Sequence, residues 1–227
     1  MFVCIEGIDG AGKTSVSETV NTLLWEKGIK SIKISKKDIH YKSSYLSLTM
    51  HSLKQILWDQ IKNEPIYEVT NSGWLFLHAA WYTIMWNNMI QELLTQYEVV
   101  LIDGWCYKLM CRFLTKENFD KNIVYHVFDE LMQGDLVFLL DVHPEICFSR
   151  KNSFTCSEMG LHEQMKGSKK ERFINFQLLV REEYIKLAMS KKWKIINVDS
   201  LCVESTARII SEIINNSIVK LKANNNM

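Results

Sequence analysis

Short apolar runs alternate along this chain with longer stretches in which apolar residues recur every three or four positions. The short runs are typical of buried strands, and the longer stretches are typical of amphipathic helices. The pattern predicts five strands, at residues 2–5, 31–35, 99–102, 136–140 and 194–198. Because strands that alternate with helices build a parallel sheet covered on both faces, we expect an α/β fold.

Two helices in this pattern have clear limits. The first is predicted over residues 13–27 and ends at Gly28, and a long one is predicted over residues 71–96. The long helix carries apolar residues, among them Trp74 and Trp81, on almost all of its faces. Such a helix is typically buried between a sheet and its neighbours, so its tryptophans are expected in the core more often than in a ligand site.

The composition favours one domain over residues 1–222, followed by a disordered asparagine-rich tail at residues 223–227. A chain of 227 residues suits a single α/β domain with a small extra subregion, and 47% hydrophobic residues are enough for a substantial core. The formal net charge of +1 argues against nucleic acid as the main partner and favours a small-molecule substrate.

The cysteines and the hydropathy pattern bear on the compartment. Six cysteines are scattered along the chain without a Cys-x-x-Cys pair, which predicts reduced thiols. No segment reaches 18 uninterrupted apolar residues, and the chain enters its first strand at once, without the pattern of a signal peptide. We therefore expect a cytoplasmic protein that does not use a membrane.

The clearest chemical motif lies between the first strand and the first helix, where the spacing is that of a phosphate-binding P-loop. Backbone N–H groups can wrap a phosphate only where no Cβ intervenes, and the helix N-terminus that follows attracts the anion. Lys13 can reach the β- and γ-phosphates, and the Thr14 hydroxyl can ligate Mg²⁺. The motif predicts a three-layer P-loop NTPase fold that binds a nucleoside triphosphate and Mg²⁺. The residues expected at the nucleotide are Gly7, Asp9, Gly10, Ala11, Gly12, Lys13, Thr14 and Ser15.

Two carboxylates follow predicted strands. Asp103 stands at the carboxyl end of the third strand, on the edge where ligands of open α/β sheets bind, so it should approach Thr14. Mg²⁺ prefers oxygen ligands, so Asp103 can bind it directly or through water; the alternatives are a proton acceptor and a cap of the next helix. Asp141, after the fourth strand, is expected to be a helix cap or turn former rather than a ligand.

A polar, basic segment at residues 150–172 has no apolar periodicity. Such a segment can form a short lid that closes over phosphates, excludes water and supplies cations to the transition state. The alternative is a solvated loop that leads into a helix.

Three blocks of the chain resemble the thymidylate kinase family. Residues 2–14 match its opening, where Glu-Gly-x-Asp-Gly-x-Gly-Lys is characteristic. Residues 136–145, with Arg150 after them, resemble the family's fourth strand and the entry to its lid, and residues 176–184 resemble the helix after the lid. Nearly the whole chain follows the family's order of elements.

The resemblance implies a nucleoside monophosphate kinase with ATP and Mg²⁺, and an acceptor pocket between the P-loop, the long helix and the helix after Asp103. In similar enzymes the carboxylate at the position of Asp9 contacts the acceptor sugar; on the residues alone, a loop-stabilising Asx turn is an equal alternative.

The resemblance also assigns roles to other residues. Lys13, Asp103 and Asp9 form the expected catalytic set, and Arg150 is expected at the donor base or phosphates. A homodimer through the long helix is possible in such a family. The other lid candidates are Lys166, Lys169, Lys170 and Arg172, whereas Arg181 is expected to be an exposed helix residue.

Two departures concern the acceptor. The family typically has Asp-Arg-Tyr after the third strand, but this chain has Gly104 at the arginine position. The long helix normally carries Leu-Leu-Phe-x-Ala-Asp/Asn-Arg, but here Leu77 stands at the base-stacking Phe and Trp81 at the Arg. Charge-assisted bonds to phosphate contribute roughly 1.5–3 kcal/mol each, so two losses should weaken ordinary monophosphate binding.

Other residues can compensate. Lys108 and Arg112, one helical turn apart, can supply the charge, as can Lys36 or Lys37 after the second strand; the alternative for the helical pair is a solvated face. Aromatic side chains can stack on a base that differs from thymine. The predicted acceptor-site residues are Asp9, Lys36, Leu77, Trp81, Trp105, Lys108 and Arg112. His78 is expected to be a satisfied core histidine rather than a base.

Three functions are consistent with these residues. The favoured one is ATP-dependent phosphoryl transfer to a nucleoside monophosphate or a modified nucleotide. The second is a kinase on the same scaffold whose acceptor is a hydroxyl of a nucleoside or another small molecule. The third is a non-catalytic nucleotide-binding protein, against which the intact Lys13, Thr14 and Asp103 argue.

Overall fold

The computed structural model describes residues 1–38, 41–59, 68–131 and 133–224. Its centre is a five-stranded sheet in the order β2-β3-β1-β4-β5, and every pair of neighbouring strands is parallel. The strands agree with the predicted ones to within one residue at each end. They are β1 (Phe2–Glu6), β2 (Ser31–Ile34), β3 (Val99–Asp103), β4 (Leu136–Asp141) and β5 (Lys194–Asn197).

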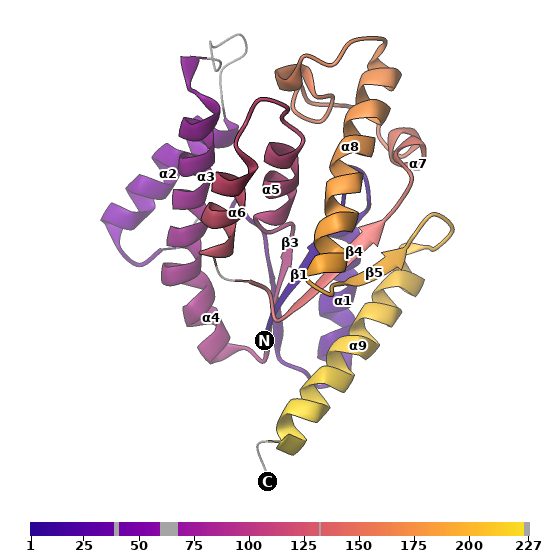
Figure 1. Cartoon of the computed structure of the whole chain (residues 1–227). Coiled ribbons are helices and arrows are strands. Elements are labelled where there is room, and N and C mark those ends of the chain that lie inside the picture. Colours follow the sequence, from indigo (N-terminus) through magenta and orange to yellow (C-terminus); the bar gives the residue numbers. More distant parts are fainter. Residues whose placement is uncertain (39–40, 60–67, 132, 225–227) are drawn as a thin grey trace.

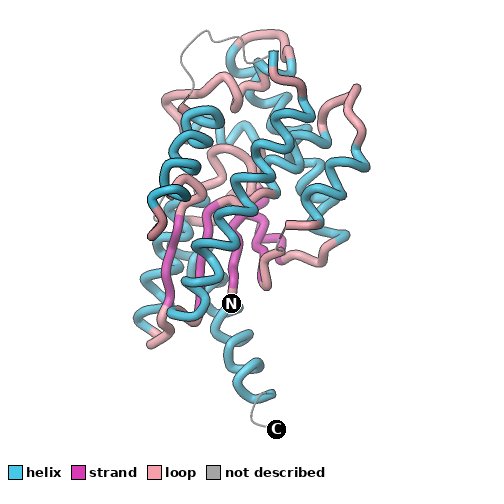
Figure 2. The backbone as a smooth tube through the Cα atoms, turned by 90° about the vertical axis from the view of Figure 1, so that its left-hand side faces the viewer, coloured by secondary structure: helices cyan, strands magenta, loops and turns pink. Residues whose placement is uncertain are grey.

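Helices cover both faces of the sheet, which confirms the predicted α/β class and the three-layer P-loop fold (Figures 1 and 2). Helix α1 packs against α9, whereas α5 packs against α6 and α8, and α3 against α2. The helices before β4 are α1 (Lys13–Glu26), α2 (Ser44–Trp58), α3 (Asn71–Met85), α4 (Gln91–Gln96), α5 (Tyr107–Leu114) and α6 (Lys121–Asp129). Those after it are α7 (Pro144–Ser149), α8 (Lys169–Ser190) and α9 (Val203–Asn224).

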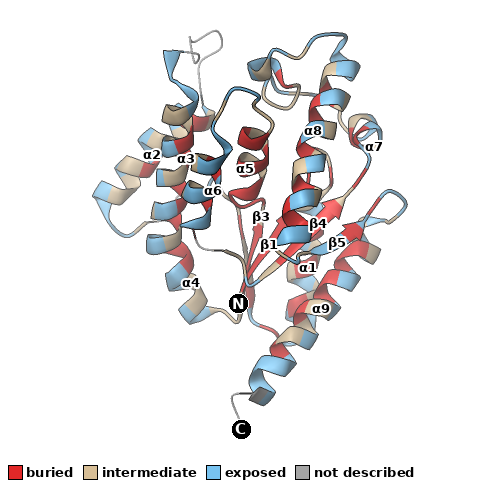
Figure 3. Cartoon of the chain, in the orientation of Figure 1, coloured by how far each residue is buried: buried red, intermediate tan, exposed pale blue. Residues whose placement is uncertain are grey.

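The hydrophobic core lies on and around the central strands (Figure 3). Every residue of β1 is buried, as a central strand with helices on both faces requires. Glu6, the last residue of that strand, is therefore a fully buried carboxylate at the entrance to the P-loop.

The predicted long helix over residues 71–96 is present but is not a regular α-helix throughout. A five-residue π-helical turn, Trp86–Ile90, separates α3 from α4. Trp81, Tyr82 and Met85 are buried on one face of α3, whereas Phe76, Ala80 and Thr83 on the other side are exposed, so the expectation of a helix buried all round is wrong.

The segment predicted as a lid leads from the end of α7 to α8 through a short 3₁₀ helix, Leu161–Glu163. Helix α8 begins at Lys169 after a capping box in which the side chains of Ser168 and Glu171 each accept from the other's backbone N–H.

Helix α9 continues to Asn224, so residues 223 and 224 are helical and not part of a disordered tail; residues 225–227 lie outside the described part of the chain. None of the helices that the structure describes combines the length and the apolar character needed to span a bilayer.

Candidate active site

The P-loop fills the turn between β1 and α1, and its shape depends on close backbone packing. Gly10 has φ +88°, and a Cβ at this position would stand 2.9 Å from the Cβ of Cys147 on α7. Only glycine fits both conditions. The ammonium of Lys13 donates to the carbonyl oxygens of Gly7 (2.8 Å) and Ile8 (2.7 Å), so it is held at the loop's own backbone.

Asp103 reaches the P-loop because β1 and β3 are neighbours. Ile5 pairs with Asp103 in the parallel register, so both strands end at the same edge of the sheet. There the Thr14 hydroxyl donates to Oδ2 of Asp103 across 2.7 Å, and the ammonium of Lys33 lies 4.0 Å from the same oxygen. The predicted approach of Asp103 to Thr14 is therefore present in the structure.

This pair of oxygen donors fits Mg²⁺. A hydroxyl and one carboxylate are a typical protein contribution to a Mg²⁺ that also binds nucleotide phosphates and water. Among the described residues, no group of three or more His, Cys, Asp or Glu side chains could hold a metal ion by itself. The chemistry of the donor set is thus that of a shared metal–nucleotide site rather than a closed metal cage.

Asp9, in the P-loop, bonds side chains of α5 and α8. Its Oδ1 accepts from the ammonium of Lys108 at 2.6 Å, and its Oδ2 accepts from Arg112 at 2.8 Å. Gln177 on α8 adds two bonds, accepting the backbone N–H of Asp9 at 3.1 Å and donating to Oδ2 at 3.2 Å. Both carboxylate oxygens are thus engaged, and the predicted pair Lys108 and Arg112 is turned toward the P-loop rather than toward solvent.

The charges around Asp9 perturb one another. Burial alone would raise the pKa of Asp9, but Lys108, Arg112 and Lys13 together hold it well below the usual value. Burial, together with Lys36, Arg112 and Lys13, lowers the pKa of Lys108 to about 7, while Asp9 opposes the shift. The pKa of Lys36 is likewise lowered, by burial first and by Lys13 and Arg112. A second anion in this cluster would favour the charged form of both lysines.

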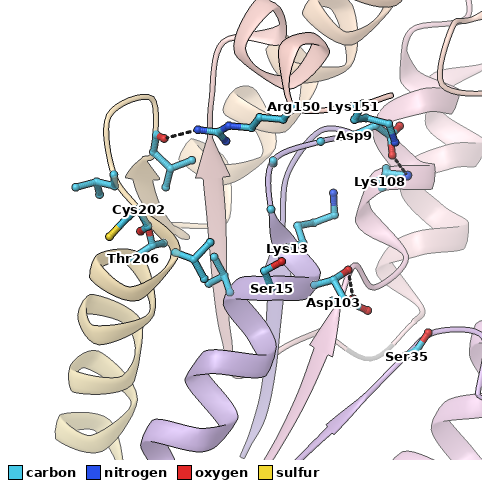
Figure 4. Close-up of a pocket in the computed structure, with 18 of the residues that line it drawn as sticks. Asp9, Lys13, Ser15, Ser35, Asp103, Lys108, Arg150, Lys151, Cys202 and Thr206 are labelled. Atoms are coloured by element: carbon cyan, nitrogen blue, oxygen red, sulfur yellow. Dashed lines mark hydrogen bonds and ion pairs between the residues drawn. The ribbon is translucent and has the colours of Figure 1, made fainter. Parts of the chain in front are cut away.

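A cavity of about 890 Å³ joins the two sides of the loop (Figure 4). Asp9 and Lys108 stand at one end, Lys13 and Asp103 near the middle, and Arg150 at the other end, where it donates to the carbonyl of Val198 at 3.5 Å. The remaining lining residues at the Arg150 end follow β5 and begin α9; they are Val198, Leu201, Cys202, Val203, Glu204 and Thr206. The volume is large enough for a nucleotide.

Most predicted site residues lie at this cavity, but five do not line it; they are Gly7, Leu77, Trp81, Trp105 and Arg112, the last of which is bonded to Asp9. The predicted residues that line it are Asp9, Gly10, Ala11, Gly12, Lys13, Thr14, Ser15, Lys36, Asp103, Lys108 and Arg150. Gly7 closes the back of the loop, and Leu77 lies on α3 away from the cavity lining. Trp81 and Trp105 are both 0% exposed, so neither offers a free ring face for stacking, and we leave both out of the acceptor site proposed below.

Three other expectations need correction. His78 is not a satisfied core histidine: its Nδ1 is buried without a hydrogen-bond partner among the described residues. Burial, together with Lys36 and Arg112, lowers the pKa of His78 to about 3. Arg181 is not a free surface residue, because it forms a bidentate ion pair with Asp141 at 2.6 and 2.9 Å. Asp141 is accordingly no helix cap, since His143 caps α7.

Residues that the sequence did not single out also belong to the site. Lys151 from the lid segment lines the cavity, whereas Lys166, Lys169, Lys170 and Arg172 do not line it. Gln177 was not predicted, although it lies in the block of α8 that resembles the helix after the lid. The strand end at Val198 could have been anticipated, because every parallel strand delivers its carboxyl end to the same edge.

A family model described as thymidylate kinase matches residues 5–210. The chain belongs to the thymidylate kinase family. It is thus a nucleotide kinase, which confirms the resemblance found in the sequence. The thymidylate kinase of Nostoc sp. is 28% identical over 220 residues, which cover 94% of each chain. That of Prosthecochloris aestuarii is 24% identical over 203 residues, covering 88% of this chain and 86% of its own.

The sequence identity between this chain and these relatives is low. A probable thymidylate kinase from Methanosphaera stadtmanae is 21% identical over 220 residues, covering 97% of this chain and 98% of its own. Membership of the thymidylate kinase family accounts for the P-loop and the parallel sheet flanked by helices. The acceptor side has to be argued from this chain's own residues.

Proposed function

We propose that this protein transfers the γ-phosphoryl group of ATP, with Mg²⁺, to the phosphate of a nucleoside monophosphate, and that Lys36, Lys108 and Arg112 bind the acceptor phosphate. Thymidylate kinases generally use ATP and Mg²⁺, and the relatives named thymidylate kinase make thymidylate the first acceptor to test. The three cations would stand in for the arginines that Gly104 and Trp81 replace.

The observation that carries this proposal is the charge balance around Asp9. Lys13, Lys36, Lys108 and Arg112 surround Asp9, and Glu6 interacts with the first two, so the four cations outnumber the two carboxylates by two when all six groups are charged. Buried charges are costly unless they are paired, which means that such a cluster fits a dianionic acceptor much better than a neutral hydroxyl. The monophosphate is therefore favoured over the nucleoside.

Each residue then has a defined part in the transfer. The P-loop backbone and Lys13 bind the donor phosphates, and Lys108 and Arg112 orient the acceptor phosphate toward the γ-phosphorus. Thr14 and Asp103 would hold Mg²⁺, which would supply neutralisation of the phosphate charge. Phosphoryl transfer needs little proton chemistry, because a phosphate dianion is already a nucleophile; positioning and electrostatic stabilisation supply most of the rate.

Arg150 and Lys151 come from the lid segment and line the cavity, and Arg150 lies at the end away from Asp9 (Figure 4). Closure of this segment would bring further cations over the transferring group and exclude water, which otherwise competes as acceptor. We place the donor base against the residues between Val198 and Thr206, which are largely apolar.

The decisive experiment is an ATP-consumption screen over matched pairs of nucleosides and nucleoside monophosphates, with the product identified by mass. Turnover of one or more monophosphates, with no turnover of the matching nucleosides, is expected. Turnover of nucleosides alone would establish the alternative hydroxyl kinase, which the loss of two arginines favours. Binding of ATP without transfer to any acceptor would instead indicate a non-catalytic protein.

Two variants test the residue roles within the screen. Lys13→Ala should reduce kcat by about a thousandfold, because the donor phosphates lose an electrostatic contact of several kcal/mol. Lys108→Ala should raise the acceptor KM about tenfold or more and leave the ATP KM unchanged. The exposed Lys220 on α9 provides a matched control for the loss of one lysine charge. A fall in ATP affinity in Lys108→Ala would contradict its placement at the acceptor.

A further inference from the structure

Glu6 is a buried carboxylate for which phosphoryl transfer has no direct use. It is 0% exposed and ends β1, immediately before the P-loop. Its Oε1 accepts the backbone N–H of Trp105 at 2.5 Å, and its Oε2 accepts the hydroxyl of Tyr184 at 2.7 Å. Both oxygens therefore meet uncharged donors.

The two donors belong to opposite sides of the active site. Trp105 is the second residue after Asp103, so its backbone N–H lies in the turn that directs the Asp103 carboxylate. Tyr184 lies on α8, two turns beyond Gln177. Gln177 in turn holds Asp9 and donates to the carbonyl of Glu158 in the lid segment at 2.9 Å. The Glu6 carboxylate thus connects the turn after Asp103 with α8, the helix that contacts Asp9 and the lid segment.

The backbone of the turn after Asp103 is bonded to β1 at two consecutive residues. Gly104 takes φ +80°, and the atom nearest to a Cβ built there would be Cε of Lys13 at 3.9 Å. A glycine without atoms packed around it does not restrict the backbone conformation at its position. The backbone N–H of Gly104 donates to the carbonyl of Ile5 at 2.9 Å, and the bond from Trp105 to Glu6 fixes the next residue. Glu6 is therefore a β1 side chain that bonds the backbone of this turn, next to the buried Trp105 ring that packs on Phe2 and Tyr82.

We propose that Glu6 is a positioning residue that sets the Asp103 turn through Trp105 and couples it to α8 through Tyr184. The inference rests on the proposed function, in which Asp103 contributes to the Mg²⁺ site. Glu6 does not touch either substrate. Its effect is exerted through the two backbone segments that it joins.

The chemistry of the pocket agrees with an ionised Glu6. The Trp105 N–H can only donate, so Oε1 acts as an acceptor, and the Tyr184 hydroxyl donates to Oε2 when Glu6 is ionised. Burial raises the pKa of Glu6 above its usual value, although the Tyr184 hydroxyl, Lys13, the Trp105 N–H and Lys36 oppose the shift. The hydrogen bonds are charge-assisted and short, so they are well suited to fixing geometry.

The Trp105 arm is tested by metal binding, which does not depend on turnover. Mn²⁺ binding to the complex with a non-hydrolysable ATP analogue can be followed by electron paramagnetic resonance. Glu6→Ala is expected to weaken Mn²⁺ binding about tenfold or more and to lower kcat about a hundredfold, because a misplacement of about 1 Å has this effect. Glu6→Gln keeps the shape and can still accept the Trp105 N–H, so it should restore much of the Mn²⁺ binding.

The Tyr184 arm is tested by a milder change. Tyr184→Phe removes only the hydroxyl, so Mn²⁺ binding should change less than about threefold while the acceptor KM rises about three- to tenfold. Tyr107→Phe is the matched control, because the buried Tyr107 hydroxyl bonds Gln133 (3.0 Å) and the N–H of Gly134 (3.1 Å) instead of Glu6. This control should lose stability without either kinetic change.

Several results would overturn the proposal. They are wild-type Mn²⁺ binding in folded Glu6→Ala, a wild-type acceptor KM in Tyr184→Phe, or the same changes in Tyr107→Phe. If Glu6→Ala does not fold, the other two variants test the proposal. Glu6→Gln should bind Mn²⁺ measurably more weakly than the wild type, and Tyr184→Phe should show the raised acceptor KM; wild-type values in both would overturn the proposal. Failure of the proposed function is distinguishable, since the wild type would then phosphorylate no monophosphate although the Mn²⁺ comparison remains readable.

Discussion

The indole nitrogen of Trp81 donates a hydrogen bond to the main-chain carbonyl of Lys36 across 2.9 Å. Trp81 stands where the family block has an arginine, yet its fully buried ring packs edge-on against Trp58 with centroids 4.8 Å apart. The substitution therefore ties the segment after β2 to α3. It fixes the backbone of a lysine that lines the cavity, in place of a cation that would reach the acceptor directly.

The loss of that single bond can be measured. Trp81→Phe keeps an aromatic ring but removes the donor, so the free energy of unfolding should fall by about 1 kcal/mol and the acceptor KM should rise about three- to tenfold. The ATP KM should stay the same. Trp25→Phe is the matched control, because the Trp25 indole donates to the carbonyl of Ser31 at 2.8 Å, away from the cavity. An equal rise of the acceptor KM in both variants would contradict the role given to Lys36.

The pKa of Lys108, lowered to about 7 by burial and its cationic neighbours, predicts the pH dependence of acceptor use. The protonated form binds a phosphate dianion, so kcat/KM for the acceptor should fall as the pH rises through about 7 in the free enzyme. Below about pH 6 the acceptor itself becomes a monoanion, which gives a second, acidic limb.

The variant Lys108→Arg tests whether the decline of kcat/KM near pH 7 comes from Lys108. A guanidinium stays charged throughout the accessible range, so the decline near pH 7 should disappear while the acidic limb remains. The measurement is kcat/KM for the acceptor between pH 6 and 9 at saturating ATP and Mg²⁺. A decline with the same pKa in Lys108→Arg would assign it to another group.

The pair between Arg181 and Asp141 should matter for stability rather than for catalysis. Arg181→Ala leaves the mostly buried Asp141 without its bidentate partner, so we expect a loss of about 1–3 kcal/mol in denaturant unfolding. Arg181→Lys should recover only part of it, since an ammonium cannot bind both oxygens in the same geometry. The control is Lys186→Ala, whose exposed pair with Glu183 should contribute less than about 0.5 kcal/mol.

Gly10→Ala should damage the donor site. Alanine would have to adopt φ +88° and place its Cβ 2.9 Å from the Cβ of Cys147, so the loop must shift, and ATP affinity should drop about tenfold or more. Gly28→Ala is the control, because Gly28 has φ +75° at the end of α1 with no atom within 4 Å of the added Cβ. It should cost about 1–2 kcal/mol in stability and leave ATP binding unchanged.

Features that depend on neighbouring residues in the sequence were predicted well. The strands, the P-loop and the meeting of Thr14 with Asp103 follow from apolar runs and from the common edge of parallel strands. Lys108 and Arg112 were predicted as a pair because they lie one turn apart on one helix. The π-helical turn at Trp86–Ile90 had no recognisable signal in the sequence.

Contacts between distant segments were predicted poorly. Gln177 bonds Asp9 across 168 residues, and Arg181 bonds Asp141 across 40, so both depend on how α8 is rotated against β1 and β4. Helical periodicity left Arg181 on an exposed face because it carries no information about an acidic strand end nearby. The core positions of Trp81 and Trp105 likewise depend on Trp58, Phe2 and Tyr82, which pack around them.

The engagement of Asp9 by Lys108 and Arg112 has a thermodynamic consequence for substrate binding. A long cationic side chain that is ordered only when its ligand arrives loses about 0.5–1.5 kcal/mol of rotational freedom at that moment. Here the carboxylate already orders both side chains as part of the fold. Acceptor binding measured by calorimetry should accordingly show little entropic penalty from these residues, and Asp9 acts as a preorganising anion that makes the recognition site rigid in advance.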